Sequence, residues 1–323
     1  MTDPFHPLSV RDIPLLTRYF AQQDTRLCNA SAGAAVLWQP YFQDAALEVD
    51  GTLLLREQFP GLGTVFSTPI GENVGNAYDF LAKYCREVGQ PLQFFPATDT
   101  DVENLRARFG VVEVTPVRAW FDYLYDAQDM VTFRGRRFNG QRNHIHKFRK
   151  LYPDAEYVPL TAADEPLLER FWQDYGAEFS KESAIAKNEL RLAKEMLRHL
   201  AGDWFMAGGL LHEGRLVAIS MGEQCGSTMQ VHIEKALYSY PGAYPTMVQE
   251  FARHCDDSVR WMNREDDARD KGLRMSKMQY LPAALGGKLC FEVGSELDRL
   301  HEMPTLHSDR LTLDALTEKD KLP

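Results

Sequence analysis

Residues 204–235 read WFMAGGLLHEGRLVAISMGEQCGSTMQVHIEK. The stretch holds three apolar runs, which are Trp204–His212, Arg215–Gln224 and Thr228–Lys235. Glu213-Gly214 between the first two runs is a hairpin signal. The stretch therefore predicts three consecutive strands, the first two joined as a hairpin.

Helices and strands are also predicted on both sides of these three strands. Before them lie a strand at Tyr157–Leu160 and helices at about Glu165–Phe179 and Lys187–Leu200. After them come a helix at Tyr244–Cys255, a strand at Val259–Met262, a helix near Lys271–Met278 and a strand near Lys288–Val293. The order β-α-α-β-β-β-α-β-α-β resembles that of the GNAT acyltransferase fold.

The first half shows a similar coarse pattern without an internal repeat by residue identity. Helices are predicted at Ile13–Ala21, Gly75–Val88 and Val102–Phe109. Strands are predicted at Leu47–Val49, Thr52–Glu57, Thr64–Ser67, Leu92–Phe95, Val111–Val114 and Ala119–Tyr125. A helix over Asn139–Tyr152 joins the halves. We expect an N-terminal domain at 1–133, a basic linking helix at 134–153, a C-terminal domain at 154–294 and a polar tail at 295–323.

Composition limits the class of protein. The 323 residues are 44% hydrophobic and 25% charged, and no apolar run approaches the roughly 20 residues of a membrane span. The N-terminus lacks the pattern of a secretory signal, so we expect a cytoplasmic protein. Five widely spaced cysteines without a C-x-x-C pair argue against a disulfide framework or a zinc site. The net charge of −10 argues against nonspecific binding along a long nucleic acid.

One segment reverses this acidic balance. Between Arg134 and Lys150 lie seven arginines and lysines and no acid. The predicted helix could clamp phosphates of a tRNA acceptor end or of a nucleotide-linked substrate, with Arg137, Arg142, Asn143 and Lys147 as candidate contacts. Alternatively, it is a solvated helix whose arginines pair with local acids.

A dense run of charge follows the predicted strand Val259–Met262. Strand ends and helix starts of this kind bind ligands in α/β folds, although a solvated loop would look similar. Lys235, Arg264 and Lys277 could stabilise an oxyanion or hold a phosphate or carboxylate. Glu265 and Asp266 could bind an ammonium group. The other candidate contacts are Asn263, Arg274 and Tyr280. The alternative is a set of mutual salt bridges.

His232 and Glu234 alternate with apolar neighbours, so we expect them to face the same side of a strand. They could serve as a general base or an anchor for a substrate amine, or form a hydrogen-bonded pair in the core. His-x-Glu resembles part of the zinc deaminase signature, but the Pro-Cys-x-x-Cys part is missing, and we predict no metal site.

Three segments carry a family resemblance, namely Gly135–Phe148, Val231–Ala236 followed by Tyr240–Tyr244, and Asn263–Lys277. In this order they resemble the family named after the C-terminal domain of phosphatidylglycerol lysyltransferase, over about residues 10 to 293. The resemblance implies a tandem GNAT-like α/β (α+β) fold with two mixed central sheets flanked by helices, related to the Fem-type peptidyl transferases. It also implies transfer of an aminoacyl group from a charged tRNA.

Three functions follow as hypotheses. The first is an aminoacyl-tRNA-dependent acyltransferase acting on an amine or hydroxyl of a small or peptide-like acceptor. His232, Glu234, Arg264, Glu265 and Lys277 are its candidate catalytic residues. No Gly-x-Ser-x-Gly motif or P-loop is present, which suits direct transfer without a covalent enzyme intermediate.

The first hypothesis needs no cofactor. The second hypothesis is an acyl-CoA-dependent N-acyltransferase, which uses acyl-CoA as a co-substrate. GNAT enzymes bind the CoA pyrophosphate at a Gln/Arg-x-x-Gly-x-Gly/Ala loop. In the equivalent segment, Ser239 to Tyr244, only Gly242 fits, because Pro241 lacks an N–H and Tyr244 is bulky. The segment could also be a simple tight turn. The third hypothesis is a non-enzymatic protein that senses a nucleotide or RNA.

Overall fold

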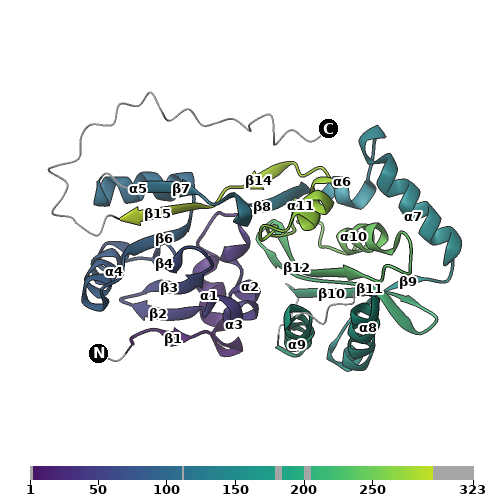
Figure 1. The fold of residues 1–323 in the computed structure, drawn as a ribbon, viewed down its shortest axis with the longest axis horizontal. Helices are drawn as coiled ribbons and strands as arrows, with labels where there is room; N and C mark the ends of the chain where they lie inside the picture. The colour runs from purple at the N-terminus through teal and green to yellow at the C-terminus, as the bar shows by residue number, and fades with distance from the viewer. Residues whose placement is uncertain (1–2, 111–112, 179–183, 200–204, 294–323) are drawn as a thin grey trace.

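The computed structural model describes residues 3–110, 113–178, 184–199 and 205–293, and it contains two mixed sheets flanked by helices (Figure 1). The polar tail expected at 295–323 lies outside the described residues. No helix of the described part is long and apolar enough to cross a membrane.

The second sheet has the strand order β14-β8-β13-β12-β11-β10-β9. Its strands are β8 (Asp122–Asp126), β9 (Glu156–Pro159), β10 (Phe205–His212), β11 (Arg215–Cys225), β12 (Thr228–Ala236), β13 (Trp261–Asn263) and β14 (Ala284–Gly286). The three strands predicted from residues 204–235 are confirmed as β10, β11 and β12, which pair antiparallel in sequence order, while Trp204 lies outside the described residues.

The first sheet has the strand order β1-β2-β3-β4-β6-β15-β7, with β5 (Ile70–Gly71) paired to β3. Its strands are β1 (His6–Pro7), β2 (Ala45–Val49), β3 (Thr52–Phe59), β4 (Gly63–Phe66), β6 (Leu92–Ala97), β7 (Glu113–Pro116) and β15 (Leu289–Val293). Of the strand predicted at 111–114, residues 111–112 lie outside the described part.

Helices cover both faces of the second sheet. They include α6 (Ala127–Thr132), α7 (Asn139–Leu151), α8 (Glu165–Glu178), α9 (Ala184–His199), α10 (Ala243–Arg253) and α11 (Lys271–Met278). Phe171 of α8 and Met196 of α9 share a buried core with Ile219 of β11, whereas Phe251 of α10 belongs to a separate core with Val217. Figure 1 shows α8 and α9 below this sheet and α10 above it.

In the first half, helices also alternate with strands along the chain. They are α1 (Ile13–Phe20), α2 (Ala32–Leu37), α3 (Gln39–Phe42), α4 (Val74–Val88) and α5 (Asp99–Phe109). Pro14 near the start of α1 costs no internal hydrogen bond, and Gly89 ends α4 in the left-handed conformation that glycine adopts freely. The short helices α2 and α3 were not predicted.

The two halves exchange one strand each. The strand predicted at 119–125 in the first half forms β8 and pairs with β13 and β14 of the second sheet. The strand predicted at 288–293 in the second half forms β15 and inserts between β6 and β7 of the first sheet. Their assignment to their own halves was wrong, because a strand pattern does not specify its partners. The domain bounds at 133, 153 and 294 stay a prediction, and the sheets do not follow them.

With this exchange the two sheets have matching orders. The first sheet ends in β7 of the first half, which lies beside β15 of the second half. The second sheet ends in β14 of the second half, which lies beside β8 of the first half. Each also contains one parallel pair at the equivalent place, β4 with β6 and β12 with β13.

A β-bulge lies in β12 at His232. Met221 of β11 pairs with Ile233, but the next residue, Gly222, pairs with Val231, so that His232 is the extra residue. Val231 therefore belongs to the core under α10, whereas Ile233 belongs to the core against α8 and α9. The prediction that His232 and Glu234 face the same side is wrong, because the bulge interrupts the alternation between them.

Candidate functional site

The candidate site lies where β12 and β13 separate. The two strands pair in parallel only over Thr228–Gln230 and Trp261–Asn263, and beyond these residues the strands diverge. Polar side chains fill the gap. We call them the splay cluster, and its members are Glu223, His232, Glu234, Tyr244, Arg264 and Glu265.

His232 is held between two carboxylates. Its Nδ1 lies 2.8 Å from Oε1 of Glu265, and its Nε2 lies 3.0 Å from Oε1 of Glu223. Burial alone would lower the pKa of His232, but the hydrogen bonds to the two glutamates outweigh burial and raise this pKa to about 9. The ring is therefore an imidazolium at neutral pH, and both nitrogens are occupied.

Glu223 connects this imidazolium to the first half of the chain. The Oε1 atom that faces His232 also accepts hydrogen bonds from the Ser31 hydroxyl and, at 2.7 Å, from the Gly33 backbone N–H. Burial alone would raise the pKa of Glu223, but these bonds and His232 lower it. Glu223 was missed by the sequence analysis, although a single acid in the apolar run of β11 was a usable signal.

Arg264 forms the second part of the cluster. Its Nη2 binds a carboxylate oxygen of Glu234 and lies 2.7 Å from the Tyr244 hydroxyl, and its guanidinium lies 4.5 Å from the ring centre of Tyr280. The residue is only 5% exposed. Its Nη1 is buried and has no hydrogen-bond partner among the described residues, so one strong donor is left unsatisfied.

Lys277 and Asn263 hold the turn that carries Arg264, Glu265 and Asp266. The Lys277 ammonium donates to the carbonyl oxygens of Arg264 and Asp266, and Asn263 Oδ1 accepts from the Glu265 N–H at 2.7 Å. Glu265 has a φ of 55°, which is unfavourable for a residue with a Cβ. These bonds therefore stabilise a strained turn, and Lys277 acts on the cluster through the backbone.

A second buried polar group lies next to this turn. Lys288 Nζ lies 2.7 Å from Oδ1 of Asp122 and 3.2 Å from Sγ of Cys28, and all three side chains are buried. Burial raises the pKa of the neighbouring Asp266 to about 6. Cys28, Asp122 and Asp266 offer atoms within 4.8 Å of one another, a spacing that could hold a metal ion, but the Lys288 ammonium already supplies a cation there. None of Cys28, Asp122 and Lys288 was predicted.

The remaining predicted residues lie outside the cluster or serve local structure. Arg274 forms a bidentate pair with Asp267, and Lys235 lies 5.1 Å from the ring centre of Tyr175. Gly242 is the residue before α10, and a Cβ there would meet the His144 carbonyl oxygen at 2.2 Å.

The basic segment lies at the edge of the molecule. Arg137 pairs with Asp129, and Arg142 donates to the Gly135 carbonyl oxygen at 2.6 Å. Asn143 and Lys147 are exposed. In the described part of the chain, none of these four side chains bonds to the splay cluster, so the structure does not bring the basic helix and the cluster into one site.

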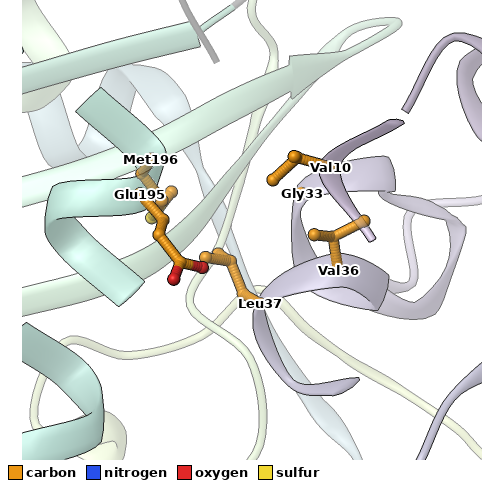
Figure 2. Close-up of a pocket in the computed structure, with 6 residues that line it drawn as sticks. All are labelled: Val10, Gly33, Val36, Leu37, Glu195 and Met196. Atoms are coloured by element: carbon orange, nitrogen blue, oxygen red, sulfur yellow. The ribbon is translucent and has the colours of Figure 1, made fainter. Parts of the chain in front are cut away.

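A small cavity lies close to the Glu223 end of the cluster. It is lined by Val10, Gly33, Val36, Leu37, Glu195 and Met196, where α2 faces α9 (Figure 2). Its volume of about 10 Å³ has room for about one water molecule. The cavity is a packing gap between the halves and too small for a substrate.

Comparisons with known proteins agree with the fold. A crystal structure of a conserved protein of unknown function from Bacteroides thetaiotaomicron matches with a TM-score of 0.80 and 26% identity, over 90% of this chain and 99% of that one. The C-terminal domain of a putative lysylphosphatidylglycerol synthetase from Agrobacterium fabrum matches with a TM-score of 0.63 and 10% identity, over 88% and 92%. The structure of L-PGS from Bacillus licheniformis matches with a TM-score of 0.61 and 11% identity, over 86% and 91%.

An uncharacterised protein of Mycoplasmoides gallisepticum is 23% identical over 164 residues, which are 50% of this chain. The match spans about half (52%) of that curated relative's length. The family model described as "Phosphatidylglycerol lysyltransferase, C-terminal" matches residues 26–290, most of the chain. This family points to an acyltransferase in general. The chain belongs to the phosphatidylglycerol lysyltransferase C-terminal family.

Proposed function

We propose that this protein transfers an aminoacyl group from a charged tRNA to an amine or hydroxyl acceptor at the splay cluster. One observation carries the proposal. Arg264 is buried among tyrosine rings, and its Nη1 donor has no partner among the described residues. The next residue in the chain is Glu265, which carries a carboxylate. A buried donor and a nearby base are the two groups that direct acyl transfer needs.

The proposed step forms one bond and breaks one bond. The acceptor nitrogen or oxygen attacks the ester carbonyl carbon of the aminoacyl-tRNA, and the developing oxyanion accepts from Arg264 Nη1. The C–O bond to the tRNA ribose then breaks. The proton lost by the acceptor passes through Glu265 to the leaving ribose oxygen, so that no other reactant is needed.

Glu265 suits the base role better than His232. The His232 side chain is 0% exposed and already protonated, whereas the Glu265 side chain is 17% exposed. Glu265 Oε1 binds His232, and Oε2 has no hydrogen-bond partner among the described residues. In this proposal His232 positions Glu265, while Glu234 and Tyr244 position Arg264.

The loop before α10 favours a donor other than acyl-CoA. In a GNAT enzyme its N–H groups would bind pyrophosphate, but here the Glu178 carboxylate accepts from the N–H of Tyr238 at 2.5 Å and of Ser239 at 3.2 Å. Gly242 is also covered by the His144 carbonyl oxygen. A pyrophosphate would have to displace an internal carboxylate, which supports the tRNA donor.

The test is a binding and turnover assay with the full chain. Thermal shift is measured with charged tRNA, deacylated tRNA, acetyl-CoA and CoA, and loss of the aminoacyl ester is followed with hydroxylamine or a peptide amine as acceptor. We expect stabilisation by tRNA and faster ester loss than without protein. Stabilisation by acetyl-CoA alone would replace the proposal with CoA-dependent transfer, and binding without any turnover would support a sensor.

Two variants locate the reaction. Glu265→Gln keeps the size of the side chain but removes the base, so we expect ester loss to fall at least 100-fold, in the range for a lost general base, while tRNA binding persists. Arg215→Gln removes an arginine that pairs with Asp174 elsewhere in the second half and serves as the control. Equal rates for Glu265→Gln and the wild type would refute the assignment of the base.

A further inference from the structure

An exposed apolar strip runs along α11 and the segment after it. Its members are each between 39% and 54% exposed, and they are Leu273, Met275, Met278, Leu281 and Leu285. Among the described residues only four other large hydrophobic side chains are exposed, and they lie elsewhere on the chain. Five such residues within 13 positions gather exposed apolar side chains on one short segment, and exposed apolar surface is a feature of interaction sites. We call them the α11 strip.

Other residues of α11 and of the segment after it support the splay cluster. Lys277 is buried and binds the turn of Arg264, and Tyr280 is buried against the Arg264 guanidinium. Whatever covers the strip would therefore lie on the same short segment that holds the candidate site.

Basic residues lie next to the strip. Phe133 packs against Tyr280 with ring centres 5.9 Å apart, and Gln141 of α7 donates to the Gln279 carbonyl oxygen at 2.7 Å. These contacts place Arg134 and Arg136 beside the end of α11. Both arginines are exposed, and neither forms an ion pair in the part of the chain that the structure describes. Lys147 and Lys150 are also exposed, form no ion pair with another described residue, and extend the positive charge along α7.

We propose that the α11 strip and the neighbouring basic residues form a docking surface for an anionic lipid bilayer. Leucine and methionine side chains enter the boundary between headgroups and acyl chains, while arginine and lysine remain at the headgroups and are attracted to anionic lipid. The protein as a whole carries a net charge of −10, so the local positive charge is what orients this face toward an anionic surface.

Charge favours a bilayer over a second copy of the chain. A two-fold contact through the strip would place the same surface on both partners and bring Arg134 and Arg136 near their own copies. An RNA partner would engage the basic residues but leaves the apolar side chains unexplained, because nucleic acids are bound through phosphates and by stacking on aromatic rings. The strip contains no aromatic residue.

Vesicle co-sedimentation of the full chain tests the proposal. We use vesicles of phosphatidylcholine alone and vesicles of equal parts phosphatidylcholine and phosphatidylserine. We expect sedimentation with the anionic vesicles and little with the neutral ones. Met275→Asp/Met278→Asp should reduce the bound fraction several-fold, and Arg134→Gln/Arg136→Gln should reduce it mainly at low salt.

Val88→Asp is the matched control, because Val88 is 46% exposed at the end of α4 in the first half. It should bind like the wild type, and the melting temperature of each variant shows that it folds. Equal sedimentation of wild type and Met275→Asp/Met278→Asp would overturn the proposal. So would a dimer in size-exclusion chromatography that this double variant abolishes, because the strip would then join two copies.

Binding to vesicles does not depend on the proposed transfer reaction. The Glu265→Gln variant, which is inactive under the proposed function, should sediment like the wild type because Glu265 lies outside the strip. Vesicle binding without ester loss in the wild type would therefore reject the proposed function and leave the docking surface standing. Ester loss without vesicle binding would reject the docking surface and leave the proposed function standing.

Discussion

His232 and Glu223 lie 3.0 Å apart, Nε2 to Oε1, and this ion pair joins the bulge of β12 to the helix α2 of the other half. The Glu223 oxygen at its centre accepts from the Gly33 N–H and the Ser31 hydroxyl as well. The arrangement and charge state of the splay cluster thus depend on contacts between two segments about 200 residues apart, since Ser31 and Glu223 are separated by 192 positions.

Stability should fall as pH rises from about 6.5 to 9. The pKa of His232 is raised from 6.5 to about 9, so the folded state binds this proton more tightly than the unfolded chain. The contribution of this proton to the free energy of unfolding is complete below pH 6.5. It is lost as pH rises through 9, which lowers the free energy of unfolding by up to about 3 kcal/mol. Urea unfolding at several pH values measures it. His232→Gln should flatten this slope, whereas His254→Gln should keep it, and an unchanged slope in His232→Gln would contradict the assignment.

Gly33→Ala should destabilise the protein by about 1–3 kcal/mol. A Cβ at Gly33 would lie 2.5 Å from Glu223 Oε1, and this oxygen cannot move away without weakening its bonds to Ser31 and His232. Gly75→Ala is the control, because Gly75 is likewise the second residue of a helix and nothing lies within 4 Å of its Cβ position. Thermal unfolding of both variants measures the loss of stability. Equal losses in the two variants would show that Glu223 moves away from the new Cβ without a cost.

Arg264→Met should cost more stability than Arg264→Met combined with Glu234→Gln. The single change leaves the buried Glu234 carboxylate without its cation, and losing one partner of a buried pair typically costs about 3–5 kcal/mol. The double change leaves no unpaired charge. Denaturant unfolding of both variants gives the comparison. If the double variant is the less stable one, then Glu234 has another cationic partner in the folded protein.

Asp44→Asn should stabilise the protein at neutral pH. Asp44 precedes β2 opposite Glu57 of β3, both are buried, and Asp44 Oδ2 has no partner among the described residues. Burial and then the Glu57 charge raise the pKa of Asp44.

The folded state thus holds a proton that the unfolded chain releases above pH 3.8, so stability decreases as pH rises above this value. We expect Asp44→Asn to gain about 1–3 kcal/mol at pH 7, and the gain to vanish toward pH 4. A gain that does not change with pH would show that Asp44 is ionised in the fold.

Local patterns predicted most elements of the second half. Lys271–Met278 is confirmed with both bounds as α11, and the 204–235 stretch is confirmed as three strands, because periodicity and turn residues report on neighbouring positions. The pairing partners of two strands could not be predicted in this way. Nothing in 119–125 or 288–293 shows which sheet each strand joins, since pairing depends on the whole topology.

Part of the candidate site was also predicted from the sequence. Arg264, Glu265, His232 and Glu234 stand in two short charged motifs, and the structure brings them together at the splay. The bulge that separates His232 from Glu234 has no sequence signal of its own. Cys28, Asp122 and Lys288 could not be found, because Cys28 and Lys288 meet across 260 positions and each is unremarkable where it stands.

The strand exchange has a consequence for how the chain folds during synthesis. β15, at residues 289–293, lies between β6 and β7, so the first sheet stays incomplete until nearly all described residues have left the ribosome. Before that point the facing edges of β6 and β7 lack their ladder partner. The first half cannot mature as an independent N-terminal folding unit, and a nascent chain arrested shortly before residue 289 should be far more sensitive to protease than one arrested well beyond residue 293.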